Sequence, residues 1–168
     1  LAEQAVDRKP TKVLYHAPKT GFFFTIDRTS GKLIDAKPFV DGINWATGYD
    51  MATGRPIENP EARFYKTGKP FIAIPGALGA HNWHPMSYNP KTGLVYIPAQ
   101  QIPQGYLQDM DELDKRKVLG FNVGTSLNKT MLPDDKAAFK AAGGATTGRP
   151  VAFDPRTGKV AWGVAYPS

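Results

Sequence analysis

Side chains able to bind or react gather in two turn-like segments of the sequence. Lys19 lies in a Pro-Lys-Thr-Gly turn, and His81, Asn82, Trp83 and His84 follow one another much later in the chain. Two histidines at this spacing can reach one metal ion, but a zinc site needs three or four ligands and no third ligand is evident. We therefore expect hydrogen-bonded structural histidines and no metal ligand. Taken alone, Lys19 is typical of a solvated turn, Asn82 of a turn and Trp83 of a core.

Other reactive groups are absent or lack the surroundings that their chemistry needs. The sequence has no cysteine, which excludes a disulfide or a thiolate metal site within it. Residues 76–79 lack the third glycine and the following helix of a nucleotide-binding loop, and no Gly-x-Ser-x-Gly elbow occurs. The acidic run from Asp109 to Asp114 has neither the glycine nor the final glutamate of a calcium loop, so a charged helix face explains it better.

The charge of the chain is moderately positive, with 21 Lys and Arg against 15 Asp and Glu and a formal charge of +6. Such a charge could attract nucleic acid or an anionic membrane. The basic residues, however, are scattered singly through turns and form no run interleaved with aromatic residues, so we expect no nucleic-acid partner. No stretch approaches the roughly 20 apolar residues of a membrane span, and none is expected in this segment.

The lysine turn lies between two strand-like runs. Residues 13–15 and 22–26 are mainly apolar and aromatic, and the link between them is bracketed by Pro18 and Gly21. A short link of this kind predicts a β-hairpin. The run that ends at Ile26 shows no alternation of apolar and polar residues, which is typical of a strand buried on both faces between sheets or neighbouring blades.

One turn pattern recurs along the chain. Each copy starts with Asp or Asn, whose side chain can accept hydrogen bonds from the following backbone amides, and has Gly at the fifth position, where a positive φ returns the chain. The copies begin at Asp27, Asp50, Asn89 and Asp154. Repeated hairpins of this kind, in a chain with 17 Gly and 15 Pro, predict an all-β propeller or a related repeat fold. The spacing between copies is irregular, so insertions must interrupt the repeat.

Two insertions are predicted to form short helices on the surface. In residues 106–118 acidic residues precede basic ones, which suits the helix dipole and allows ion pairs one turn apart. Residues 133–142 also have a helical composition, and we expect that helix to end at Gly143 and Gly144.

Longer stretches resemble one enzyme family. Residues 79–100, which include Asn82 and Trp83, closely resemble the corresponding stretch of the pyrroloquinoline quinone (PQQ)-dependent alcohol dehydrogenases. Residues 152–162 resemble the tryptophan-docking motif of the quinoprotein dehydrogenases, in which a Trp of one blade packs on the next. A plain hairpin with a core aromatic is the alternative, and under either interpretation Trp162 is expected to be buried. Further segments that match the family in the same order are 12–14, 17–23, 27–29 with 31–34, 44–48 and 53–58.

The resemblance covers most of the chain and is weakest from 106 to 144. It implies that residues 1–168 are a segment of a PQQ-dependent dehydrogenase propeller domain, incomplete at both ends, all-β with short helical insertions, and amounting to about two to three blades of an eight-bladed propeller. Lys19 matches the cation that hydrogen-bonds the quinone oxygens, and Asn82 and Trp83 match pocket residues that face the cofactor. Reduction of an ortho-quinone places negative charge on its oxygens, which a fixed ammonium stabilises.

The activity that the resemblance implies is oxidation of small primary alcohols to aldehydes by hydride transfer to PQQ, with this segment supplying one wall of the pocket and no catalytic residue. The aspartate base is expected a short way before Leu1, and the Ca²⁺ ligands further upstream. The adjacent cysteine pair of many relatives and a haem attachment motif are absent here. The implied electron acceptor is a cytochrome c or a linked domain carrying haem c, and the implied compartment is the periplasm.

Two alternatives remain open from the residues alone. One is a non-catalytic β-propeller module that binds a protein or glycan, and the other is a sugar or polyol dehydrogenase of the same cofactor class. As an isolated segment the chain is expected to be catalytically silent. It is also expected to self-associate through open blade edges, because unpaired strands and uncovered sheet faces favour association.

Overall fold

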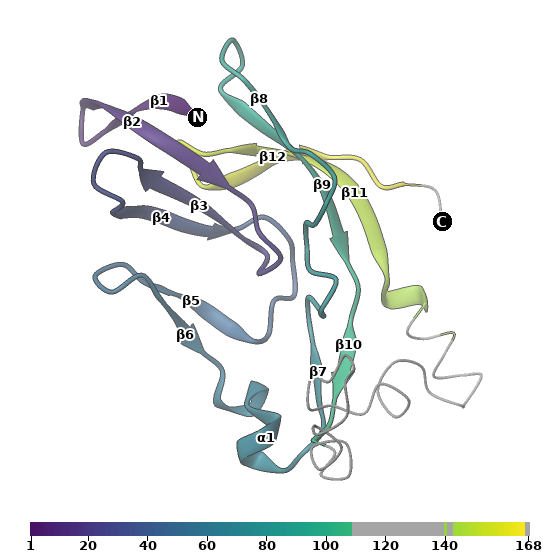
Figure 1. The fold of residues 1–168 in the computed structure, drawn as a ribbon. Coiled ribbons are helices and arrows are strands. Elements are labelled where there is room, and N and C mark those ends of the chain that lie inside the picture. Colours follow the sequence, from purple (N-terminus) through teal and green to yellow (C-terminus); the bar gives the residue numbers. More distant parts are fainter. Residues whose placement is uncertain (109–139, 141–142, 167–168) are drawn as a thin grey trace, which may run out of the picture.

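The fold is known from a computed structural model, which describes residues 1–108, 140 and 143–166. Two four-stranded antiparallel sheets dominate it and lie beside each other at one end of the molecule (Figure 1). The first sheet is a meander of four consecutive strands: β1 (Ala2–Val6), β2 (Lys9–His16), β3 (Phe22–Asp27) and β4 (Leu33–Pro38). The pairing of β2 with β3 confirms the predicted hairpin around the lysine turn.

The second sheet has the strand order β12, β11, β9, β8. Its strands are β8 (Ser87–Asn89), β9 (Leu94–Gln101), β11 (Thr147–Asp154) and β12 (Lys159–Gly163). The long pair of β9 and β11 is separated in sequence by the insertion that the irregular turn spacing predicted. Each four-stranded antiparallel meander has the form of a propeller blade, so the all-β prediction is confirmed.

Smaller elements fill the other end of the molecule (Figure 1). These are the hairpin of β5 (Ala46–Asp50) and β6 (Arg55–Glu58), a 3-10 turn η1 (Pro60–Ala62), the one-turn helix α1 (Phe64–Thr67), and the pair of β7 (Phe71–Ala73) with β10 (Gln104–Tyr106). The sequence did not predict η1, α1, β7 or β10 as separate elements. Their segments are too short for a hydrophobic period to be read.

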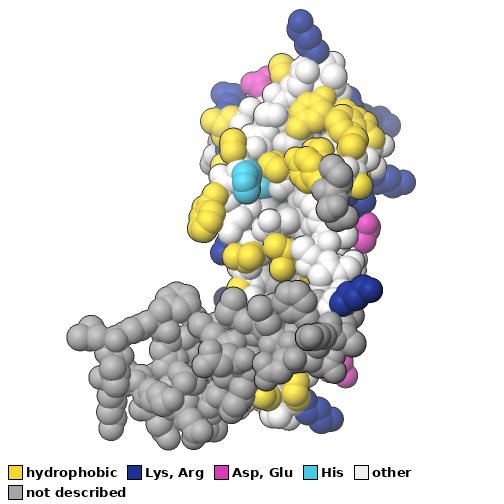
Figure 2. Space-filling model, turned by 90° about the vertical axis from the view of Figure 1, so that its right-hand side faces the viewer, with side chains coloured by type: hydrophobic (Ala, Val, Ile, Leu, Met, Phe, Trp, Pro, Cys, Tyr) yellow, Lys and Arg dark blue, Asp and Glu magenta, His cyan; other side chains and the backbone are white. Residues whose placement is uncertain are grey.

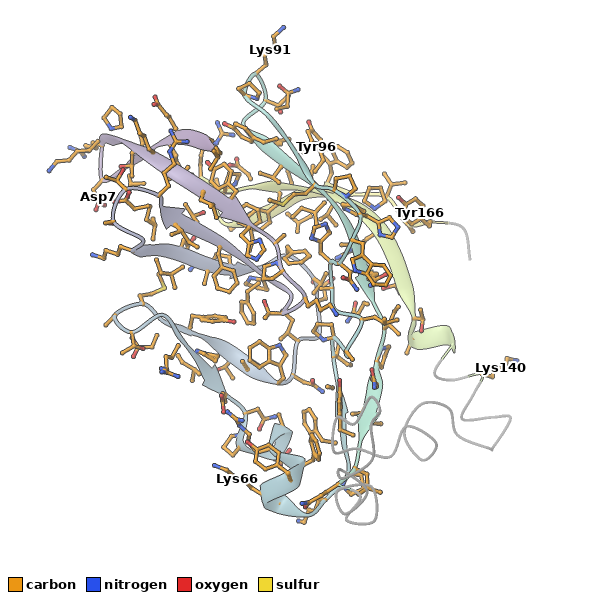
Figure 3. All side chains as sticks on the ribbon, viewed as in Figure 1. Asp7, Lys66, Lys91, Tyr96, Lys140 and Tyr166 are labelled. Atoms are coloured by element: carbon orange, nitrogen blue, oxygen red, sulfur yellow. The ribbon has the colours of Figure 1, made fainter. Side chains whose placement is uncertain are left out.

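The four recurring turns form as predicted and connect β3 to β4, β5 to β6, β8 to β9 and β11 to β12. In the first of them, Oδ1 of Asp27 accepts from the backbone amide of Thr29 at 2.8 Å, and the amide of Gly31 donates to the carbonyl oxygen of Asp27 at 2.7 Å. Gly31 has a φ of 75°. The other three copies repeat both hydrogen bonds and the positive φ, and the β8–β9 copy carries Lys91 far into solvent (Figure 3).

Acid is expected to weaken three of these turns. Hydrogen bonds hold the pKa of each turn aspartate below its usual value: from the Ser30 hydroxyl to Asp27, from the Ala52 amide to Asp50, and from the Arg156 side chain to Asp154. Folding therefore favours the carboxylate, so this stabilisation is complete above the unfolded pKa of about 4 and is lost as the pH falls through the lowered folded values.

The check is urea unfolding between neutral pH and pH of about 3. Changing all three aspartates to asparagine should keep the turns, since Asn89 already occupies the same position in the fourth copy, and should flatten the loss of stability with acid. The matched control is Asp7→Asn, in the turn between β1 and β2, which should leave the acid profile unchanged. An unaltered profile in the triple variant would contradict the assignment.

The core lies between the two large sheets, and β3 is its centre. Phe23 is 2% exposed, and its ring centroid is 4.5 Å from that of Phe153 on β11 and 5.5 Å from that of Tyr15 on β2. The neighbouring Phe22 points to the opposite side, where its ring lies 5.2 Å from that of Tyr49 on β5. The strand is thus packed on both faces, which confirms the interpretation of its unbroken apolar run.

Two expectations about the second half of the chain need correction. Trp162 is 48% exposed and not buried between sheets, because β12 is an edge strand; its ring packs against that of Tyr96, at 5.9 Å between centroids. Its docking role stays a prediction. Residues 143–145 are helical, so the second insertion helix does not end at the glycine pair. The remainder of that helix, apart from Lys140, and residues 109–118 of the first insertion lie outside the described residues.

Candidate functional site

Lys19 is held at the tip of the β2–β3 turn by contacts with a distant segment. Its carbonyl oxygen accepts from the amide of Ala80 at 2.9 Å, and its Nζ donates to the carbonyl oxygen of Ala77 at 3.1 Å. Gly79 lies directly against it with a φ of 79°, and a Cβ at this glycine would fall 2.4 Å from Cβ of Lys19. Only glycine allows both this conformation and this approach.

The same segment is tied to the second large sheet. The amide of Gln100, on β9, donates to the carbonyl oxygen of Ala80 at 2.8 Å, and Nε2 of Gln100 donates to that of Gly79 at 3.1 Å. Backbone hydrogen bonds therefore run from the lysine turn, through Ala80, to β9. Since Lys19 lies in a turn of the first sheet and β9 belongs to the second, the position of the ammonium is set by both sheets.

Two of the three predicted cofactor residues meet in one cavity. Lys19 and Asn82 both line a pocket of about 370 Å³, together with His16, Ala17, Pro18, His81 and Met86. The Asn82 amide nitrogen donates one of its two hydrogens to the carbonyl oxygen of Leu78 at 3.1 Å, which leaves the second N–H for a ligand. Trp83 does not line this cavity. It is 88% exposed, so the core role expected for it in isolation is wrong, and its ring is available to a ligand or another part of a larger protein.

His81 lies in the wall of this cavity and is 9% exposed. Its Nδ1 is 2.5 Å from the carbonyl oxygen of Ala17, and its Nε2 is 2.6 Å from that of His84. Each ring nitrogen therefore lies within hydrogen-bonding distance of a backbone carbonyl oxygen, and these two contacts fix the orientation of the ring. The prediction of a hydrogen-bonded structural histidine is confirmed for His81.

The cavity as a whole favours negative charge. Desolvation by burial, followed by an electrostatic contribution from His81, lowers the pKa of His16. None of the described residues that line the pocket is acidic. Among the described residues, no group of three or more His, Asp or Glu side chains is arranged to hold a metal ion. The donors present suit an anionic, oxygen-rich organic ligand better than a cation.

Removing the His81 ring is expected to destabilise the fold by about 2 kcal/mol, because His81→Leu leaves the carbonyls of Ala17 and His84 without the ring nitrogens that they contact. Chemical denaturation measures the loss. The matched control is His84→Ala, which removes an exposed ring but keeps the backbone carbonyl that His81 uses. Equal stabilities for the two variants would show that the bridge contributes nothing.

Comparison with known proteins finds relatives along the entire chain. Quinohemoprotein alcohol dehydrogenase ADH IIB of Pseudomonas putida is 44% identical over 168 residues, which is 100% of this chain and 22% of the relative. Quinohemoprotein alcohol dehydrogenase of Comamonas testosteroni is also 44% identical, over 100% of this chain and 23% of its own length. The 1-butanol dehydrogenase (cytochrome c) of Thauera butanivorans is 42% identical over 96% of the chain. This chain is homologous to a segment of the quinohemoprotein alcohol dehydrogenases. It spans less than a quarter of their length.

Solved structures of quinohemoprotein alcohol dehydrogenases share the fold. The ADHIIG enzyme of Pseudomonas putida superposes with a TM-score of 0.84 at 38% identity, over 98% of this chain and 24% of that one. The Comamonas testosteroni enzyme gives 0.81 at 42% identity, over 99% and 24%. A europium-containing methanol dehydrogenase, at 24% identity and a TM-score of 0.58, shows the fold alone. These neighbours confirm the partial propeller.

No family model matches the chain. In the part of the chain that the structure describes, no helix has both the length and the apolar character needed to cross a membrane.

Proposed function

We propose that this chain forms one wall of the PQQ pocket of a quinone-dependent alcohol dehydrogenase, and that residues 1–168 belong to its propeller domain. In this proposal Lys19 and Asn82 contact the cofactor and Trp83 presents its ring beside them. The observation that supports it most directly is that Lys19 and Asn82, far apart in sequence, line a single cavity. Homology to quinohemoprotein alcohol dehydrogenases along the whole chain supports the choice of cofactor.

The residues present fit such a cofactor. PQQ is an anionic ortho-quinone with carboxylates, and the cavity offers the Lys19 ammonium and the Asn82 amide, with no acidic side chain among its described lining. An acceptor-rich ligand of negative charge is what such donors bind. A cavity with Asp or Glu in place of these residues would repel it.

Each side chain of the wall has a distinct task in this proposal. The quinone, when bound, supplies the hydride acceptor. Lys19, fixed by Ala77 and Ala80, holds a positive charge in place before the reaction, so no reorganisation is needed when oxygen atoms gain negative charge. Asn82 orients the ligand through the second N–H of its amide. The exposed ring of Trp83 can cover an aromatic ligand and exclude water.

The remaining parts of the activity are assigned to the parent protein. We propose small primary alcohols as substrates and a cytochrome c or a linked haem domain as electron acceptor, in the periplasm. The names of the relatives support this, since one is a 1-butanol dehydrogenase (cytochrome c) and others are quinohemoproteins. The general base and the Ca²⁺ ligands that the family resemblance implies are expected in other parts of the parent.

Cofactor titration of the full-length parent tests the proposal. Asn82→Asp places a carboxylate in the cavity and should raise the Kd for PQQ at least about tenfold, because like charge adds to the loss of the amide. The matched control is Asn89→Asp, the same substitution in a turn where the other three copies already have Asp. Equal affinities of the two variants for PQQ would show that the cavity is not part of the cofactor site. Absence of any quinone-dependent alcohol oxidation would favour a propeller that only binds partners.

A further inference from the structure

A second cavity reaches Lys19 and differs in character from the first. Its volume is about 510 Å³, within the range of small-molecule sites. Aromatic rings make up much of its wall, contributed by Trp45 on the approach to β5, Phe64 of α1, Phe71 of β7 and Tyr106 of β10. Because Lys19 lines both cavities, a ligand in this aromatic cleft can reach the ammonium that faces the proposed cofactor.

The rings of the aromatic cleft are held in place by other contacts. Phe64 and Tyr106 stack with centroids 5.5 Å apart and planes 23° apart. Tyr106 is the strand partner of Phe71 in the β7–β10 pair. The indole nitrogen of Trp45 donates to the carbonyl oxygen of Thr20, next to Lys19, at 3.0 Å. A cleft with fixed walls loses little entropy when a ligand enters, which favours binding.

The charges at the cleft are satisfied within the protein. Arg63 donates from Nε to Oε2 of Glu58 at 2.6 Å and from Nη1 to the hydroxyl of Tyr65 at 2.5 Å. The hydrogen bond from Arg63 lowers the pKa of Glu58. Burial raises the pKa of the Tyr106 hydroxyl, which keeps it neutral. Among the described lining residues, Lys19 is the one charged side chain without an oppositely charged partner.

We propose that the aromatic cleft binds the alkyl or aryl tail of an uncharged alcohol whose hydroxyl end faces Lys19, and that Phe64 sets the preference for long over short alcohols. This inference rests on the proposed function for the position of the hydroxyl. Apolar walls favour a hydrocarbon tail, since each buried methylene contributes about 0.8 kcal/mol. The internal ion pair leaves no free cation for a carboxylate at the tail, so neutral alcohols are favoured over hydroxy acids.

Tertiary alcohols separate binding from turnover, because they have no hydrogen on the carbinol carbon to transfer. We expect α-terpineol to bind the full-length parent, prepared without cofactor, at least about tenfold more tightly than tert-butanol, as measured by calorimetry or tryptophan fluorescence. Phe64→Ala should reduce the affinity for α-terpineol about tenfold and leave that for tert-butanol within twofold. In the holoenzyme the same variant should lower kcat/KM for 1-octanol relative to ethanol by a similar factor.

The matched control is Ile72→Ala, on the same strand as Phe71. Ile72 is 63% exposed, so its removal should leave both affinities unchanged. Phe64→Leu keeps an apolar side chain and a folded α1, and should lose less affinity than Phe64→Ala. Equal binding of the two tertiary alcohols, or equal effects of Phe64→Ala and Ile72→Ala, overturns the cleft assignment. If PQQ does not bind but α-terpineol still does, the proposed function is overturned and the assignment of the cleft stands.

Discussion

Replacing Lys19 by alanine in the full-length parent is expected to lower kcat for alcohol oxidation by about 100-fold to 1,000-fold, the range found when one preorganised donor to a developing oxyanion is lost. The ammonium is fixed by Ala77 and by the backbone link to Ala80, so its charge is in position before the reaction. Lys19→Arg keeps the charge but not the point geometry of an ammonium and should retain part of the rate.

Steady-state kinetics of the PQQ-loaded parent measure this loss. The matched control is Lys91→Ala, the same substitution at the solvent tip of the β8–β9 turn, which should leave kcat within twofold (Figure 3). Since Lys19 lines the cavity that contains Asn82, a loss in affinity for PQQ is expected as well. A Lys19→Ala enzyme with nearly full kcat would show that the quinone oxygens lie elsewhere.

Phe23→Ala is expected to destabilise the protein by about 3 to 5 kcal/mol, the cost typical of removing a fully buried phenylalanine. The ring joins the two large sheets through Phe153 and packs against Tyr15 of its own sheet, so its loss opens a cavity between blades that neither sheet can close alone. Thermal or chemical unfolding measures the effect. Leu14→Ala, on the neighbouring strand and 36% exposed, should cost far less. Comparable losses at the two positions would contradict the placement of the core at Phe23.

The local features of the fold were predictable from sequence. The turns that start at Asp27, Asp50, Asn89 and Asp154 depend on one side-chain acceptor and one glycine within five residues, so the signal is complete in the sequence. The hairpin around Lys19 was predictable for the same reason. The strand β1 was not anticipated, because Ala2–Val6 is short and carries few β-branched or aromatic residues.

The candidate site was predictable only in part. Resemblance to a family pointed to Lys19, Asn82 and Trp83, and the cavity joins the first two, but their roles toward a cofactor stay predictions. His81 was read as structural, and its second carbonyl contact depends on Ala17, which only the tertiary fold brings near. No local sequence signal predicts that Gly79 packs on Lys19, because the residue that requires a glycine there lies 60 positions earlier in the chain.

The exposed apolar side chains show another limit of sequence reasoning. Large rings such as Trp83 and Trp162 were assigned to a core on size and hydrophobicity alone, yet both are substantially exposed. Figure 2 shows hydrophobic side chains gathered over one face of the molecule. Apolar groups in such number on a surface suit contact with further protein, which agrees with a chain that spans less than a quarter of its relatives' length.

The contact between the lysine turn and the second sheet is made mostly by main-chain atoms: Ala80 donates to Lys19, and Gln100 donates to Ala80. Peptide groups are the same in every residue, so this joint survives most substitutions that keep the chain path. Related proteins can therefore vary the side chains around the pocket, and with them ligand preference, while the cation stays in register with the opposite wall. Gly79 is the exception, because the Cβ of any other residue would collide with Lys19 and push the two walls apart.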